Sequence, residues 1–240
     1  MSHKKKETRI TKEEYDWTDP ESIRHKNMDK WREKDEDPYL TLPRNCRQLL
    51  FINSYRGLKK PAKILDYGCA YGDLLMMMKT LNPKHDIYGL EFIDSVAKEA
   101  EERIGKDHVF NQSCSERIPL KKESFDIIFS FDMIEHIPSR SDVGLFLKEC
   151  NRVLKKGGLF IIATPNCSKL MRIIYKTTGN GYIIDPKVHP NAYNMRRLKK
   201  EVGSRMKIVD SVRGYDIGLI TRVLSWFGAY KHICIVATKR

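Results

Sequence analysis

The sequence predicts an α/β protein with a mainly parallel β-sheet that carries helices on both faces. Between residues 63 and 165, short apolar runs alternate with longer stretches whose apolar residues recur at helical spacing. A glycine-rich turn joins the first apolar run to the first helical stretch, which is typical of a strand–turn–helix unit in such a sheet. The length of 240 residues suits one domain with appended segments.

The individual elements follow from these patterns in chain order. A first helix is expected from about residue 43 to 55, before Lys59-Lys60-Pro61 breaks it. Further helices are expected near 73–81, 94–104, 142–154, 168–176 and 194–203. Strands are expected near 63–67, 86–90, 108–112, 125–130, 158–164, 206–212 and 232–238. Lys155-Lys156-Gly157-Gly158 is expected to end the helix over 142–154.

Residues 1–40 form a polar leading segment with a different composition. A helix is expected over about 13–34, and its aromatic and apolar residues are Tyr15, Trp17, Met28 and Trp31. Such residues in a polar segment indicate that it folds over another surface. We therefore divide the chain into an N-terminal helical cap, residues 1–40, and a domain over residues 41–240.

The glycine-rich turn is the most informative local feature. The apolar run ends in Asp66, and small residues follow at Gly68, Ala70 and Gly72. Such a turn lets backbone approach a nucleotide-like ligand closely. Glu91 ends the next expected strand, 19 residues after Gly72, where its carboxylate can accept both hydroxyls of a ribose. Together these residues indicate a cofactor site, with an ordinary glycine-rich turn as the simpler alternative.

The spacing of the small residues indicates which cofactor the turn suits. A dinucleotide fingerprint needs Gly-x-Gly-x-x-Gly, but position 73 is Asp. Asp66 would also set a negative charge against a pyrophosphate. A carboxylate there suits a cationic ligand end instead, such as the ammonium and sulfonium of S-adenosylmethionine (SAM).

Several motifs in order resemble those of class I SAM-dependent methyltransferases of the small-molecule type. Asp66–Gly72 is similar to the family's first motif, Asp-x-Gly-x-Gly-x-Gly, with Ala70 at the middle glycine. Other stretches resemble its fourth strand, the acid-x-x-Glu-His segment after that strand, its Leu-Lys-Pro-Gly-Gly element and the end of its fifth strand: 125–130, 132–137, 154–162 and 164–166. The resemblance covers about 62–166 and implies a Rossmann-like seven-stranded sheet with the last strand antiparallel.

The resemblance also implies which residues bind SAM. They lie in the loops after the first four strands: Asp66, Gly68, Cys69, Ala70, Gly72, Glu91, Phe92, Cys114, Ser115, Glu116 and Phe131. Cys114 stands where the family usually has an Asp that accepts from the adenine amino group. Because a thiol is a weak acceptor, we expect a weaker contact or one made by Ser115 instead.

His136, just beyond the fourth expected strand, is the candidate catalytic base. An imidazole is neutral and basic near pH 7, so it can take the proton of a hydroxyl nucleophile. The alternative is a histidine with a structural role. His189 and Tyr193, in the segment expected on the substrate side, are further candidates.

Asp132, Glu135 and His136 match, position by position, an acid-x-x-Glu-His cluster that binds a divalent cation in ubiquinone-type O-methyltransferases. Three such ligands can hold Mg²⁺ or Zn²⁺. The spacing sets them on one face only if the segment is helical. Our interpretation of the sequence is that no metal binds here.

The positive charge lies mostly in the last third of the chain. The formal net charge is +13, and residues 166–240 hold 15 Lys and Arg against 4 Asp and Glu. Basic and apolar residues interleave over 169–176, with Lys169, Arg172 and Lys176, and again over 219–227. These segments are expected to form a lid, to contact an anionic membrane, or to pack inward against the sheet.

Cysteine usage and the N-terminus predict a cytoplasmic protein. The six cysteines are scattered without a Cys-x-x-Cys pair, which fits a reducing compartment and argues against structural zinc. No apolar stretch reaches the ~18 residues of a membrane span. The charged start of the chain has no signal-peptide pattern.

We therefore predict a SAM-dependent methyltransferase that modifies an oxygen or nitrogen of a small metabolite, with acidic and lipid-linked acceptors both open. A nucleic-acid (RNA) methyltransferase is an alternative that the charge alone favours. The Pro-Pro-aromatic turn of base-amine methyltransferases is replaced by Phe131-Asp132-Met133-Ile134, and a Pro-Cys pair is absent. Ala70 and Cys114 suggest a further alternative, a non-catalytic module with the SAM fold.

Overall fold

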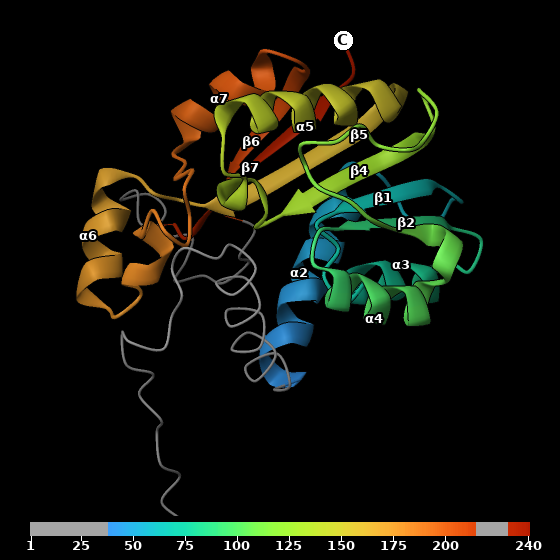
Figure 1. The fold of residues 1–240 in the computed structure, drawn as a ribbon, viewed down its shortest axis with the longest axis horizontal. Helices are drawn as coiled ribbons and strands as arrows, with labels where there is room; N and C mark the ends of the chain where they lie inside the picture. Colours follow the sequence, from blue (N-terminus) through green and yellow to red (C-terminus); the bar gives the residue numbers. More distant parts are fainter. Residues whose placement is uncertain (1–37, 215–229) are drawn as a thin grey trace, which may run out of the picture.

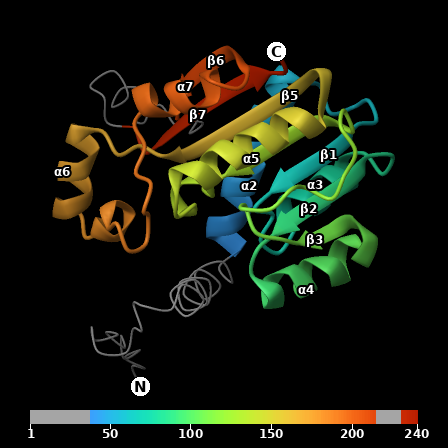
Figure 2. The same ribbon diagram turned by 45° about the horizontal axis from the view of Figure 1, so that its top comes forward.

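The computed structural model describes residues 38–214 and 230–240, which form one seven-stranded sheet between two layers of helices (Figures 1 and 2). The strand order is β3-β2-β1-β4-β5-β7-β6. The strands are β1 (Lys63–Tyr67), β2 (Asp86–Glu91), β3 (Val109–Asn111), β4 (Phe125–Phe131), β5 (Leu154–Pro165), β6 (Lys207–Arg213) and β7 (His232–Thr238). β7 runs antiparallel to the other six strands, so the predicted Rossmann-like topology with an antiparallel last strand is confirmed.

Helices cover both faces of this sheet. The α-helices are α2 (Pro38–Tyr55), α3 (Asp73–Leu81), α4 (Asp94–Ile104), α5 (Arg140–Val153), α6 (Lys169–Thr177) and α7 (Met195–Gly203). Short 3-10 helices are η2 (Lys106–His108), η3 (Ile134–His136) and η4 (Gly181–Ile184). The helices and strands predicted between residues 43 and 238 are therefore all present, with ends that differ by a few positions, whereas the helix predicted over about 13–34 lies outside the described residues.

Alternation along the buried strands divides the core into two layers. On β4, Ile128 packs with the residues of α5 and α7, whereas Ile127 and Phe129 pack with those of α2, α3 and α4. The same alternation continues on β5, where Phe160 and Ile161 point to opposite faces. Because side chains of a strand alternate between faces, each face buries a continuous apolar layer.

The region after α5 departs from the sequence prediction. The helix ends at Val153, and β5 begins directly at Leu154, so the double glycine lies within the strand and does not end the helix. The ladder between β4 and β5 shifts register in this stretch. A Cβ at Gly158 would lie 2.8 Å from the Leu154 side chain and 2.9 Å from the Lys155 carbonyl oxygen, so the irregular stretch requires glycine there.

The carboxyl ends of β1, β2, β4 and β5 meet at one edge of the sheet, and β7 starts there because it is antiparallel to β5. α6 and η4 form a small unit beside this edge, at the left of Figure 1. The predicted cap over 1–40 falls almost wholly, and the amphipathic segment 219–227 wholly, outside the described residues. No helix in the described ranges is long and apolar enough to cross a bilayer.

Candidate functional site

The glycine-rich turn after β1 folds tightly against β2 and the start of α3. The backbone N–H groups of Gly68 and Cys69 donate to the Leu90 carbonyl oxygen at 2.8 and 3.0 Å. Gly68 and Gly72 have φ of +89° and +77°. A Cβ at Gly68 would lie 2.8 Å from Met133, and one at Gly72 would lie 2.5 Å from Ile104. Both glycines are therefore required by backbone conformation and by close packing.

Ala70 carries a cost that the sequence did not reveal. Its φ is +47°, in the left-handed region, where a residue with a Cβ is disfavoured by roughly 1–2 kcal/mol. The strain is compatible with the fold because the Ala70 N–H donates to Glu91 Oε2 at 3.0 Å. Alanine in place of the middle glycine of the motif thus strains the backbone of the turn and also fills space beside it.

Glu91, at the end of β2, is held by backbone. Its Oε1 accepts from the N–H groups of Phe92 at 2.8 Å and Ile93 at 3.0 Å, and its Oε2 accepts from Ala70. The carboxylate therefore lies between the turn after β1 and the start of α4. This fixes its orientation at the edge of the sheet, where a ribose was predicted to bind.

Asp66 is a buried carboxylate near a second one. Its exposed fraction is 5%, and among the described residues no hydrogen bond reaches its side chain. Burial, and then the charge of Glu91, raises the pKa of Asp66 well above its usual range. A buried acid without a cation is costly, and a cationic ligand end would offset that cost. The residues present therefore fit the ammonium and sulfonium of SAM.

The other predicted cofactor residues lie in the loops at the same edge. Cys69 is buried, and a Cβ at Gly89 would lie 2.5 Å from its Sγ, so only its backbone can line a ligand site. Phe92 is 40% exposed directly after β2. Phe131, half-buried at the end of β4, packs beside Phe129.

The loop after β3 carries the predicted adenine-side residues. Cys114 is half-buried against the core layer of α5, whereas Ser115 and Glu116 are exposed. The Ser115 hydroxyl lies 2.8 Å from that of Ser113, and the Ser115 N–H donates to the same Ser113 oxygen at 3.3 Å. The loop thus presents hydroxyl groups beside the thiol, which suits the predicted contact through Ser115.

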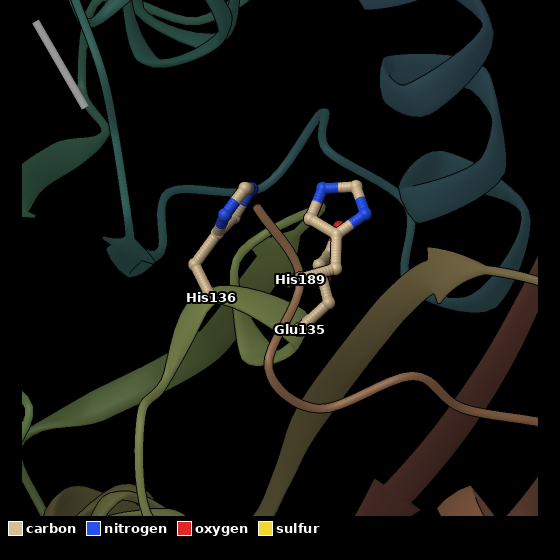
Figure 3. A group of neighbouring side chains, drawn as sticks. All are labelled: Glu135, His136 and His189. Carbon is tan, nitrogen blue, oxygen red and sulfur yellow. The ribbon is translucent and has the colours of Figure 1, made fainter. Parts of the chain in front are cut away.

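His136 lies in η3, directly after β4, and meets a histidine from a distant segment. Its Nδ1 lies 3.1 Å from the carbonyl oxygen of Val188, and its ring contacts that of His189 edge to face, with centroids 4.6 Å apart. Glu135 lies beside them, and the ligand atoms of the three side chains lie within 4.8 Å of one another (Figure 3). Sequence reasoning named each histidine separately but missed their proximity.

The backbone of the loop after η4 explains this proximity. The Asn191 N–H donates to the Glu135 carbonyl oxygen at 3.1 Å, and the Asn191 side chain donates to the Ile137 carbonyl oxygen. The Arg197 guanidinium of α7 donates to Asn191 Oδ1 at 2.6 Å. These hydrogen bonds hold the loop against η3. No sequence pattern around His189 predicts them.

Asp132 does not join this cluster. η3 includes only Ile134–His136, so the acid-x-x-Glu-His segment is not a continuous helix and Asp132 lies outside it. Its φ is +53°, and its Oδ1 is buried without a hydrogen bond, 3.6 Å from His232 Nε2. The three motif residues are therefore not brought together as one ligand set, and His189 occupies the third place.

Glu135 and Tyr193 are both buried, in different ways. Glu135 is 2% exposed, and its Oε2 accepts from Thr164 at 2.8 Å; burial, and then the charge of Asp132, raises its pKa well above the usual range. Tyr193 lies in the core under the Arg197 guanidinium, and burial raises its pKa to about 12. Its position fits a packing role better than a role as a base.

The basic segment after β5 forms α6, which packs on one face only. Met171 and Tyr175 are buried with Ile184 and Cys167. The opposite face exposes its basic and apolar residues, which are Lys169, Leu170, Arg172, Ile173 and Lys176. Ile173 is 61% exposed, so inward packing does not account for the whole helix.

Fold and site together define the chain as carrying a class I SAM-dependent methyltransferase domain. Residues 65–162 match the family described as "Methyltransferase domain". The class is one of enzymes, and its cofactor is S-adenosylmethionine.

Curated relatives match the same part of the chain. It is 32% identical over 126 residues to "Ubiquinone biosynthesis O-methyltransferase" of Bradyrhizobium diazoefficiens, covering 51% of this chain and 45% of that protein. It is 31% identical over 118 residues to "Demethylmenaquinone methyltransferase" of Thermotoga maritima, covering 48% and 50%. The chain thus spans about half the length of these relatives.

Solved structures share the fold. A SAM-dependent methyltransferase from Aquifex aeolicus has a TM-score of 0.61 at 16% identity, covering 92% of this chain and 99% of that one. Geranyl diphosphate C-methyltransferase from Streptomyces coelicolor, solved with Mg²⁺, geranyl diphosphate and S-adenosyl-L-homocysteine, has a TM-score of 0.57 at 17% identity, covering 80% and 78%. At these identities the likeness establishes the fold alone.

Proposed function

We propose that this protein transfers a methyl group from SAM to an oxygen or nitrogen of a small metabolite. The observation that carries the proposal is the pair of acids at the glycine-rich turn. Asp66 is buried without a hydrogen bond from the described residues, and Glu91 is fixed by backbone N–H groups beside it. This arrangement suits a ligand with a cationic end and a ribose.

The remaining predicted residues complete the cofactor site in this proposal. The backbone at Gly68, Cys69, Ala70 and Gly72 lines the ligand, and Phe92 and Phe131 flank it. Cys114, Ser115 and Glu116 lie on the adenine side. SAM supplies an activated methyl group on a sulfonium, whose positive charge is lost as the methyl is transferred. The protein chiefly has to align the acceptor and exclude water.

We assign the methyl acceptor to the part of the site beside η3, at the carboxyl end of β4. His136 lies directly after β4, and its Nδ1 faces a carbonyl oxygen, which leaves Nε2 as the nitrogen that can take a proton. An imidazole in this position suits a hydroxyl acceptor. The names of the curated relatives, a ubiquinone and a demethylmenaquinone methyltransferase, agree with a small and lipid-linked acceptor.

The exposed face of α6 supports an anionic, membrane-associated acceptor. Lys169, Arg172 and Lys176 accompany exposed Leu170 and Ile173 on one short helix. Basic and apolar side chains together favour the surface of an anionic bilayer. The cysteines of the described residues form no disulfide, which suits a cytoplasmic protein. Nucleic-acid methylation has the charge as its only support.

Mass spectrometry of the purified full chain tests the core of the proposal. We expect bound SAM or S-adenosylhomocysteine, and calorimetry is expected to give micromolar affinity for SAM. Incubation with methyl-labelled SAM and a metabolite extract is then expected to label a small molecule. A chain that binds no SAM would instead fit the non-catalytic interaction module, and labelling of RNA alone would favour the nucleic-acid alternative.

A further inference from the structure

Glu149 and Arg152 form a buried ion pair near the C-terminal end of α5. Glu149 is 4% exposed, and Arg152 Nε and Nη2 donate to its two carboxylate oxygens at 2.9 and 2.6 Å. Burial of two charges costs desolvation energy that their mutual attraction only roughly offsets, so such a pair adds little to the stability of a fold by itself. The remaining hydrogen bonds of the two side chains indicate what the pair holds in place.

The pair holds the far end of the loop after β3, residues 112–124. The Arg152 guanidinium donates to the carbonyl oxygens of Ile118 and Leu120, both at 2.8 Å. Glu149 Oε2 accepts from the Ile118 N–H at 3.1 Å. No helix or strand forms over residues 112–124, all of which lie in the described part of the chain. These three bonds to α5 therefore do for the loop what a regular element does for its own backbone.

The near end of the same loop is held at β2. The Gln112 N–H donates to the Glu91 carbonyl oxygen at 3.1 Å. The Gln112 side-chain amide donates to the Arg117 carbonyl oxygen at 2.6 Å, which closes the first part of the loop on itself. Residues 113–116, the adenine-side turn of the proposed cofactor site, lie between these two anchors. The position of this turn thus depends on both ends of the loop.

We propose that Glu149 and Arg152 are positioning residues for the adenine of SAM. Because the pair fixes one end of the turn over residues 113–116, it sets where that turn meets the base. The inference rests on the proposed SAM site. Asp66 and Glu91 lie at the ends of β1 and β2 and not on this loop, so contacts to the methionine and the ribose are expected to survive loss of the pair.

The alternative is an ion pair that only stabilises the domain. Loss of such a pair would lower the free energy of unfolding and would act equally on every ligand of the cofactor site. A positioning role has a different consequence, because the turn contacts only the base. Affinity then falls for a ligand that carries the adenine amino group, and stays unchanged for one that lacks it.

Calorimetry of the full chain with two ligands tests the inference. The ligands are S-adenosylhomocysteine and its hypoxanthine analogue, in which an oxygen replaces the adenine amino group. The wild type is expected to prefer the adenine ligand by roughly 3–10-fold, the contribution of one hydrogen bond. In Glu149→Gln and in Arg152→Ala this preference is expected to fall to about one, because the displaced turn no longer meets the amino group.

Gln112→Ala is a second, milder test of the same turn. It releases the side-chain bond to the Arg117 carbonyl oxygen and leaves the buried pair intact. The preference for the adenine ligand is expected to fall in the same direction. Because Gln112 is only half-buried, this variant remains informative if substitution of the buried pair prevents folding.

Asp126 provides a matched control at the amino ends of β1 and β4, away from the site. Its carboxylate pairs with Lys155 at 3.1 Å and accepts from the Lys63 N–H at 2.9 Å, so it also joins an ion pair to a backbone N–H. Asp126→Asn is expected to lower the free energy of unfolding while the ligand preference keeps its wild-type value. Urea unfolding and circular dichroism show which variants are folded.

The outcomes separate this inference from the proposed function. A lower preference in the pair variants and in Gln112→Ala, but not in Asp126→Asn, supports the positioning role. A wild type that binds neither ligand contradicts the SAM site itself. A wild type that binds both ligands equally overturns the positioning role and leaves the SAM site standing. Pair variants that keep the preference, lose affinity for both ligands equally or fail to fold overturn it as well.

Discussion

The two sides of the candidate site are constructed differently. The cofactor side, Asp66–Gly72 with Glu91, comes from two consecutive strands and the turn between β1 and α3. The acceptor side, Glu135, His136 and His189, joins η3 to a loop more than 50 positions away, as the bond between His136 and Val188 shows. The cofactor side needs backbone with positive φ, which favours glycine. The acceptor side needs no special backbone conformation, only side chains that the fold brings together.

The largest expected effect lies on the acceptor side. His136→Ala is expected to lower turnover by about 10²–10⁴-fold, the usual contribution of a proton-accepting or equivalent activating group. SAM affinity is expected to stay unchanged, because His136 belongs to the acceptor side. Steady-state rates and calorimetry on one preparation check both points. Near-normal turnover would return His136 to a structural role and favour an amine acceptor.

Charge reversal on α6 tests whether this helix, beside the acceptor side, binds an anionic membrane surface. The triple variant Lys169→Glu, Arg172→Glu and Lys176→Glu is expected to bind anionic vesicles more weakly by at least about 3 kcal/mol, since each basic residue near such a surface contributes about 1 kcal/mol. Co-sedimentation with the vesicles measures this binding. The difference should shrink as salt rises, because the Debye length is about 8 Å at physiological ionic strength.

A parallel oligonucleotide-binding measurement is the control for the α6 variant. Vesicle binding alone by the wild type supports a lipid-linked acceptor, and oligonucleotide binding alone supports the nucleic-acid alternative. If the wild type binds neither, α6 presents only a solvated face. SAM affinity of the triple variant should match that of the wild type.

On the cofactor side, Asp66→Ala and Glu91→Ala are each expected to weaken SAM binding by about 1–3 kcal/mol, because polar ligand groups lose their charged partners. Calorimetry measures this directly. Since His136→Ala should leave the same affinity intact, the pair of experiments divides the site into its two sides. Wild-type affinity in both acid variants would refute the assigned cofactor site.

Asp66→Asn should stabilise the free protein while it weakens SAM binding. Burial raises the pKa of Asp66 in the folded state, so the folded chain binds its proton more tightly than the unfolded chain. The wild type therefore loses stability as pH rises from the ordinary carboxyl range through the raised value. The free energy of unfolding of Asp66→Asn should exceed that of the wild type at neutral pH, and the gap should close in acid. A gap independent of pH would contradict this assignment.

The smallest effect is expected at Ala70. Ala70→Gly relieves a left-handed alanine at φ +47° but adds backbone entropy to the unfolded chain. The net gain in the free energy of unfolding is expected to be about 1 kcal/mol or less, with SAM affinity equal or slightly higher. Urea unfolding and calorimetry check the two values. A clear loss of stability would show that the turn tolerates alanine without strain.

The sequence by itself determined the sheet, the glycine-rich turn and the class of protein. Side chains on strands such as β4 point alternately into the two core layers, which fixes the positions of apolar residues. Positive φ at Gly68 and Gly72 excludes most residues other than glycine. The strands and the turn are therefore both visible as sequence patterns. Even there, the backbone strain at Ala70 and the burial of Asp66 required the structure. Ala70 bonds to Glu91 of β2, and Asp66 lies between β2 and β4, so both depend on neighbours that no local pattern specifies.

Only the tertiary structure decided which residues lie together beside η3, on the proposed acceptor side. Asp132, Glu135 and His136 lie within five positions of one another in sequence, yet Asp132 lies outside the short η3 and outside the group. His189 enters because Asn191 bonds to the backbone of η3 and Arg197 holds Asn191 in turn. Such long-range hydrogen bonds leave no periodicity in the sequence, because they depend on where the chain returns and not on the residues beside His189.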